Sequence, residues 1–165
     1  MPDRTRAPQS GDTQAGTCPP PAAARLLTAW HACTLAETAG TAVAQALADS
    51  SQQRACDLLE DIVHLLALTG PLLESAVASE RLSGTTWEEI ATILRLTPEA
   101  ARARYGPAVE RFQHHRSHPE PEPADSSTYE ERWNTFPVLH PHEAARDLAE
   151  WLGRQGLVTN PAEHI

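Results

Sequence analysis

Two helix-start signals only eleven residues apart constrain this chain more than any other feature. Thr86 and Glu89 have the spacing of a capping box, in which hydroxyl and carboxylate each accept a hydrogen bond from a backbone N–H at a helix start. Thr97, Pro98 and Glu99 give the second start, with a capping hydroxyl, a proline at the first helical position and an acidic first turn. The chain must therefore end one short helix and begin another within a tight turn.

The join between the two helices can be placed from Pro98. A proline disfavours helical geometry at the residue before it, so the first helix should end near Leu94 or Arg95. Capped helices this short hold together only through tertiary packing. We expect the following residues to form the inner faces and the turn: Trp87, Ile90, Ala91, Ile93, Leu94, Leu96, Ala100, Ala101 and Tyr105.

Helical periodicity also dominates the chain before this segment, where no stretch has the pattern of a strand. A helix is predicted over Ala22–Asp49, where apolar residues recur at helical spacing, and a second over Ser51–Leu68. The second has apolar residues on more than one stripe, which predicts the central helix of the core. Residues 69–71, Thr-Gly-Pro, should break the pattern before a third helix over Leu72–Leu82. The predicted fold class is therefore all-α.

Composition divides the rest of the chain. Residues 1–21 are rich in Pro, Thr and charge and predict a disordered tail before a helical bundle at 22–116. Residues 117–128 form an acidic, Pro-rich linker. Residues 129–165 form a C-terminal arm, with an amphipathic helix over His142–Arg154.

The C-terminal arm has two interpretations, because periodicity reveals an apolar face but not what covers it. The arm could fold back on the helical core. It could instead bind a protein partner, since aromatic anchors on a tethered helix suit a groove. The anchors would then be Trp133, Phe136 and Trp151.

The stretch WEEIATILRLTPEAARARYG, residues 87–106, resembles the helix-turn-helix in the fourth region of sigma factors and of small regulators built on it. The preceding LLESAVASERLSGTT is similar to the lead-in helix of many actinobacterial regulators of this kind. The resemblance covers roughly residues 71–113. Arg95 and Arg104 depart from it, since the family often has Gly at the first position and an apolar residue at the second.

This resemblance implies a double-stranded DNA partner, with the second helix in the major groove. Arg102 is the best base reader, since a guanidinium can bond both acceptors of guanine, and Glu99 could accept from cytosine. By position, the residues facing DNA would be Thr97, Pro98, Glu99, Arg102 and Ala103. The candidates for phosphate contacts are Thr86, Arg95, Arg104, Arg111 and Arg116. A solvated face of exposed Arg and Glu is the plainer interpretation of the same residues.

Charge supports DNA binding only locally. The chain has a net charge of −9, and all 13 basic residues are Arg. Residues 81–116 are nevertheless net basic, with six Arg against four Glu. An acidic surface elsewhere weakens non-specific DNA affinity without excluding a local site. We therefore predict a DNA-binding transcriptional regulator. The alternative is a non-catalytic interaction adaptor on the same helices, touching RNA polymerase or another regulator.

Other functions lack sequence support. No Gly-rich phosphate loop, nucleophile elbow or carboxylate pair beside a His is present, so we expect neither enzymatic activity nor a cofactor. His114 and His118 share a helix face but lack matching ligands, so solvated histidines are favoured over a metal site.

The cellular context is predicted in the same way. Cys18, Cys33 and Cys56 should be free thiols. With no run of about 18 apolar residues and no basic-then-apolar leader, we expect a cytoplasmic protein without a membrane partner. A homodimer through the first three helices is a further expectation, since helix-turn-helix proteins commonly act as dimers.

Overall fold

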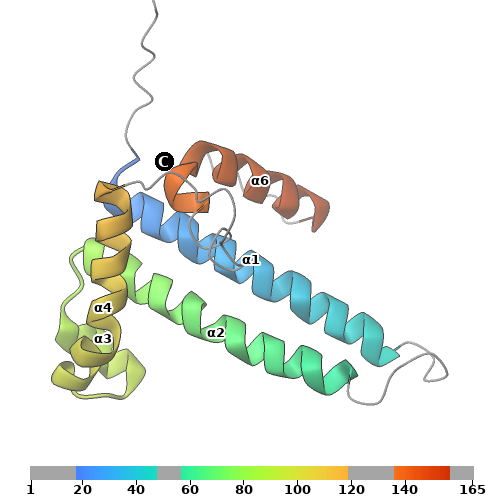
Figure 1. Ribbon diagram of the computed structural model, residues 1–165, viewed down its shortest axis with the longest axis horizontal. Helices are drawn as coiled ribbons and strands as arrows, with labels where there is room; N and C mark the ends of the chain where they lie inside the picture. The colour runs from blue at the N-terminus through green and yellow to red at the C-terminus, as the bar shows by residue number, and fades with distance from the viewer. Residues whose placement is uncertain (1–17, 48–56, 119–135, 157–165) are drawn as a thin grey trace, which may run out of the picture.

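The computed structural model describes residues 18–47, 57–118 and 136–156, and within these ranges every regular element is a helix (Figure 1). This confirms the all-α class for the described part of the chain. The predicted tail over residues 1–21 and the predicted linker over 117–128 are each described only at one end, where α1 already begins at Pro20 after a buried Cys18, and α4 runs to Ser117. Residues 1–17 and 119–128 lie outside the described residues, as does Trp133.

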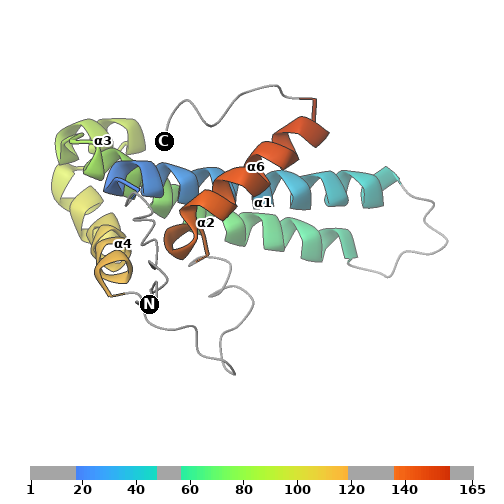
Figure 2. The ribbon, with the colours of Figure 1, turned by 90° about the horizontal axis from the view of Figure 1, so that it is seen from above.

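A long helical hairpin organises the molecule. Helix α1, Pro20–Leu47, runs beside α2, Asp57–Leu82, in the opposite direction (Figure 1). Helices α3, Trp87–Leu94, and α4, Pro98–Ser117, stand together at one end of this hairpin. Helix α6, Pro141–Arg154, packs on α1 and crosses it obliquely, as the view from above shows (Figure 2). The other end of the hairpin extends away from these three helices.

The predicted break at residues 69–71 is wrong. Helix α2 is continuous through Thr69, Gly70 and Pro71, so the two predicted helices are one. Pro71 removes a single N–H and therefore a single i→i−4 hydrogen bond. The Thr69 hydroxyl meanwhile donates to the carbonyl of Leu66 at 2.6 Å. Packing along α1 keeps the two halves of α2 in line, and this tertiary support outweighs the local helix-breaking preference.

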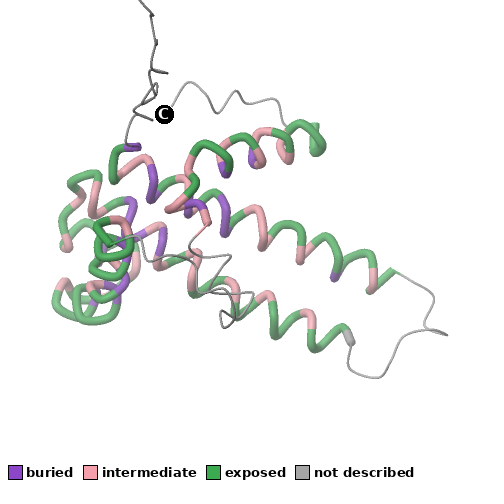
Figure 3. Tube along the Cα trace, turned by 45° about the horizontal axis from the view of Figure 1, so that its top comes forward, coloured by how far each residue is buried: buried purple, intermediate pink, exposed green. Residues whose placement is uncertain are grey.

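The buried residues gather into three clusters near α3, α4 and α6. One joins the start of α1 to Phe112 of α4, and a second joins Trp30 of α1 to α6. The third joins α2, α3 and α4 through Val77, Ile90 and Tyr105. The core therefore occupies one end and the middle of the molecule, as the burial colouring shows (Figure 3).

The outer half of the hairpin contradicts the prediction that the second helix forms the centre of the core. In α2 the large apolar residues before Leu72 are mostly exposed, and on α1 Val43 and Leu47 are exposed too. Two helices alone cannot cover more than the stripe at which they meet, and no third described element packs there. The exposed residues on α2 are Leu58, Leu59, Ile62, Val63, Leu66 and Leu73.

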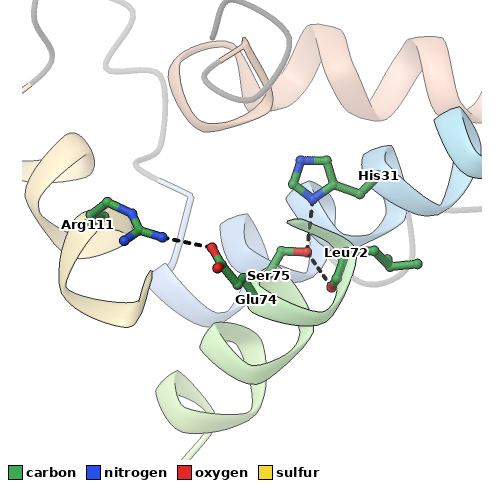
Figure 4. A network of polar contacts seen from close by, with 5 residues as sticks. All are labelled: His31, Leu72, Glu74, Ser75 and Arg111. Atoms are coloured by element: carbon green, nitrogen blue, oxygen red, sulfur yellow. Dashed lines mark hydrogen bonds and ion pairs between the residues drawn. The ribbon is translucent and has the colours of Figure 1, made fainter. Parts of the chain in front are cut away.

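Polar contacts fix the inner half of α2 against its neighbours (Figure 4). The buried hydroxyl of Ser75 donates to the carbonyl of Leu72 at 2.9 Å and lies 3.1 Å from Nδ1 of buried His31. Because its one proton is used, Ser75 accepts from the Nδ1–H of His31. On the same stretch of α2, Glu74 pairs with Arg111 of α4 at 2.8 Å. These contacts tie α2 to α1 and to α4.

The C-terminal arm folds back on α1 over its described residues. Ala144 and Leu148 are buried against Trp30, and the Phe136 ring lies 5.4 Å from the Trp30 ring. Helix α6 begins at Pro141, one residue before the predicted start, and ends at the predicted Arg154. Phe136 and Trp151 are both half-buried, so neither is a fully exposed anchor.

One stretch, Leu58–Leu82, is long and apolar enough to cross a membrane by length and composition. The stretch runs through residues 69–71, where a break was predicted. A core helix of a soluble protein can be equally long and apolar. Its inner half carries Ser75 and Ser79, both buried within the fold.

Candidate functional site

The start of α3 is held by the predicted capping box. The Glu89 N–H donates to Oγ1 of Thr86 at 3.3 Å, and the Thr86 N–H donates to a carboxylate oxygen of Glu89 at 2.8 Å. The Thr86 hydroxyl donates to the same oxygen at 2.9 Å. These hydrogen bonds to the ionised form lower the pKa of Glu89.

The turn after α3 is closed by a left-handed residue. Arg95 has φ 55° and ψ 43°, and among the described residues it is the one non-glycine with positive φ. The N–H of Leu96 then reaches back to the carbonyl of Ala91 at 2.9 Å, which closes the helix end in a Schellman-like turn. The left-handed backbone costs a non-glycine residue about 1 kcal/mol. Arg95 therefore holds a backbone conformation that glycine adopts more readily.

The start of α4 follows at once. Thr97 Oγ1 accepts from the Ala100 N–H at 3.2 Å, Pro98 stands at the start of the helix and Glu99 is in its first turn. Ala101 and Tyr105 are buried, and with Ile90 they form the inside of the α3–α4 pair. Helices α3 and α4 are thus capped locally and joined by packing, as predicted, although only α3 is short.

The predicted inner face needs two corrections. Ile93 is 76% exposed, and Ala100 is exposed as well. Ala100 lies about 100° round α4 from buried Ala101, and Ile93 lies about 100° round α3 from half-buried Leu94, so the covered face is narrower than expected. Ile90 and Ala101 are buried as predicted. Trp87, Leu94 and Leu96 are half-buried and pack on the edge of the cluster.

The predicted base-facing residues fall together on the first turns of α4. Glu99, Arg102 and Ala103 are exposed, while Thr97 and Pro98 lie at the helix start beside them. Within the described residues, no hydrogen bond or ion pair engages the guanidinium of Arg102. An arginine in this state can bind a ligand without first breaking an internal contact.

Of the predicted phosphate contacts, Thr86 is used in the capping box, two arginines are exposed, and two have partners in other helices or at the start of α1. Arg95 and Arg104 are exposed, and the Arg104 guanidinium lies 5.3 Å from the centre of the Tyr105 ring. Arg111 is half-exposed but paired with Glu74 at 2.8 Å. Arg116 donates to the carbonyl of Cys18 at 2.9 Å and so helps to hold the start of α1. The latter two have structural partners that the sequence did not reveal.

An open groove of about 650 Å³ runs along one side of α4. Arg102 and Ala103 line it from α4, while Arg81 and Trp87 line the opposite wall. The Arg81 guanidinium lies 4.9 Å from the centre of the Trp87 ring and also donates to the carbonyl of Thr85. Sequence reasoning missed Arg81 because it assigned Trp87 wholly to the core. The sequence did offer a signal for this pair, namely an arginine near the end of one predicted helix and a tryptophan at the start of the next.

The histidines near the end of α4 form no metal site with other described residues. The His114 and His118 rings are stacked, with centroids 4.7 Å apart. Within the described ranges, no group of three or more His, Cys, Asp or Glu side chains could hold a metal ion.

Comparisons with protein-family models, with curated proteins and with solved structures give no match for this chain. Any functional conclusion therefore depends on the geometry of α3, α4 and the groove.

Proposed function

We propose that the protein is a DNA-binding transcriptional regulator that inserts α4 into the major groove. The observation that carries this proposal is the join at Arg95. A left-handed residue, followed directly by a capped helix, presents the first turns of α4 to solvent while Ala101 and Tyr105 anchor them from within. That arrangement is the one a helix-turn-helix uses to present side chains to base edges.

Three exposed arginines would make most of the DNA contacts. Arg102 is the base reader, since its guanidinium suits the two major-groove acceptors of guanine. Arg95, before the helix, and Arg104, on its other flank, would contact phosphates and fix the register. Glu99 would reject phosphate and favour a cytosine amino group. Arg111 has a lesser role than the sequence implied, because its charge is already balanced by Glu74.

The experiment is a selection from random duplexes, followed by titration at two salt concentrations. Arg102→Ala should cost about 1 to 3 kcal/mol at the selected site and relax the preference at one base pair. Arg104→Ala should weaken binding to all sequences alike and reduce the salt slope by about one unit. Arg146→Ala is the matched control, since Arg146 is an exposed arginine on α6, remote from α4. Enrichment of no sequence would overturn the proposal.

The groove supports a second candidate, the non-catalytic interaction adaptor. Its walls combine a tryptophan and small apolar residues with two Arg and two Glu, a balanced set that suits a protein partner better than a polyanion. Trp87→Ala separates the candidates. DNA selection with Arg102 dependence supports the regulator. Failure of the selection, with a captured protein lost on Trp87→Ala, supports the adaptor.

A further inference from the structure

The open face of α2 has the repeat of a helix–helix seam. Leu59, Val63, Leu66, Gly70 and Leu73 follow one another at alternating spacings of four and three residues. This is the a/d pattern of a coiled coil, in which a second helix covers the stripe. The four large residues of the seam are between 37% and 66% exposed. Within the described residues, no second helix covers them.

The same stripe is covered where α2 meets α3 and α4. Val77, four residues beyond Leu73, continues the pattern and is 4% exposed, packed with Ile90 and Tyr105. The seam is therefore an ordinary packing face that has a partner at its inner end and, in the described part of the chain, none at its outer end. Ser75, by contrast, lies on the side of α2 that faces His31 and α1.

We propose that a second copy of this chain covers the seam, with the two α2 helices antiparallel. The seam is self-complementary about its midpoint, Leu66. When two copies cross there in opposite directions, Leu59 of one lies beside Leu73 of the other, and Val63 lies near Gly70. A Cβ at Gly70 would meet nothing within 4 Å, so the space that the larger residue needs is open.

Antiparallel pairing also follows from what surrounds the seam. Helices α3 and α4 cover α2 just beyond Leu73, so a parallel pair would bring both copies of them to the same end. It would also place both acidic starts of α2, at Glu60 and Asp61, side by side. An antiparallel pair separates both the bulk and the like charges.

The exposed apolar area of the seam is large enough for a dimer of modest affinity. Leu58 and Ile62 flank the seam and are also exposed, which gives six large apolar side chains on one face of α2. At about half exposure they present roughly 450 Å² of apolar surface, more than a scattering of single residues would give. Specific interfaces at the small end bury about 600 Å² per partner, which the rims of the seam can supply.

Charge disfavours nucleic acid or anionic lipid as the occupant. From Asp57 to Glu80 the sequence of α2 has no Arg or Lys. Phosphate groups would meet only carboxylates there. Insertion of Leu58–Leu82 into a bilayer would also remove the buried pair Ser75 and His31 from their contact. Pairing with a second copy avoids both the repulsion between phosphates and carboxylates and the loss of the Ser75–His31 contact.

The test is the mass in solution by sedimentation equilibrium, over concentrations from about 1 to about 100 µM. Wild type should approach twice the 17.9 kDa of one chain. Leu66→Glu, on the seam, should raise the dissociation constant at least about tenfold, which is a large change for one interface residue. His64→Glu is the control, because it adds a negative charge at an exposed position of α2 about 100° round the helix from Val63, off the seam, and should leave the mass unchanged.

A disulfide test fixes the direction. In a chain whose three cysteines are changed to Ala, Leu66→Cys should cross-link with itself under a mild oxidant. Leu59→Cys should not, but should cross-link when mixed with Leu73→Cys. Self-linking of Leu59→Cys would overturn the antiparallel arrangement. A monomer at the highest concentration would overturn the dimer, as would flotation of the wild type with neutral phosphatidylcholine vesicles that Leu66→Glu abolishes.

Discussion

The α3–α4 end and the outer half of the hairpin contain similar apolar side chains in very different surroundings. Ile90 of α3 is 3% exposed, whereas Ile62 of α2 is 42% exposed. The first belongs to a helix of eight residues and the second to one of 26. Length and apolar content therefore do not decide burial here. A short helix must be covered on its apolar face to exist at all, whereas a long one can remain helical with part of its face open.

The largest difference should appear when matched isoleucines are truncated. Ile90→Ala should cost about 2 to 4 kcal/mol of unfolding free energy, because it removes buried atoms and leaves a cavity. Ile62→Ala should cost less than about 1 kcal/mol at concentrations where the chain is monomeric, since solvent already contacts that side chain. Urea unfolding of both variants at low micromolar concentration measures the two losses of unfolding free energy. Equal losses would show that the outer half of α2 is buried in solution.

Ile93→Ala is the control within α3. It changes the same side chain in the same helix, but at a position 76% exposed. It should therefore behave like Ile62→Ala rather than Ile90→Ala.

The same contrast shows what the sequence could predict. The capping box at Thr86, the cap at Thr97 and the end of α3 at Leu94 all follow from local chemistry, and all are present as predicted. Each depends on residues three or four positions apart, so no distant contact can change it much.

Long-range packing explains what the sequence missed. The break expected at Pro71 failed because support from α1 outweighs one lost hydrogen bond. Arg111 was read as a phosphate ligand, yet its partner Glu74 is 37 positions away in the sequence. The pairing of Arg81 with Trp87 likewise depends on how the end of α2 meets the start of α3. Sequence periodicity reveals which face of a helix is apolar, but not which element packs on that face.

Two glycines extend the comparison to the backbone, with smaller effects. Gly84, at the α2–α3 turn, has φ 100°, so Gly84→Ala should destabilise the protein by about 1 kcal/mol. Gly40, in the outer half of α1, is helical and a Cβ there meets nothing within 4 Å. Gly40→Ala should therefore stabilise the protein by about 0.5 to 1 kcal/mol. Thermal unfolding should show shifts of opposite sign, and a loss at Gly40 would reveal a close neighbour in solution.

The smallest effect concerns Cys33, on the stretch of α1 that α6 covers. Burial first, and then the charge of Glu37, raise the pKa of its thiol to about 11, although Arg154 acts in the opposite direction. The folded state therefore prefers the neutral thiol. Any stability that this group contributes is present below its ordinary pKa of 9.0 and is lost as the pH rises toward about 11.

Cys33→Ala should remove this part of the pH dependence. We expect the unfolding midpoint of the wild type to fall more steeply between pH 9 and about 11 than that of the variant. Cys18→Ala is the comparison, since burial also raises the pKa of Cys18 but at the start of α1, away from α6. If α6 leaves α1 in solution, Cys33 should react with a thiol reagent at pH 8 as fast as a free cysteine does. If α6 stays on α1, Cys33 should react slowly, and Leu148→Ala in α6 should make the reaction faster. That result would show that α6 shields the Cys33 thiol from solvent.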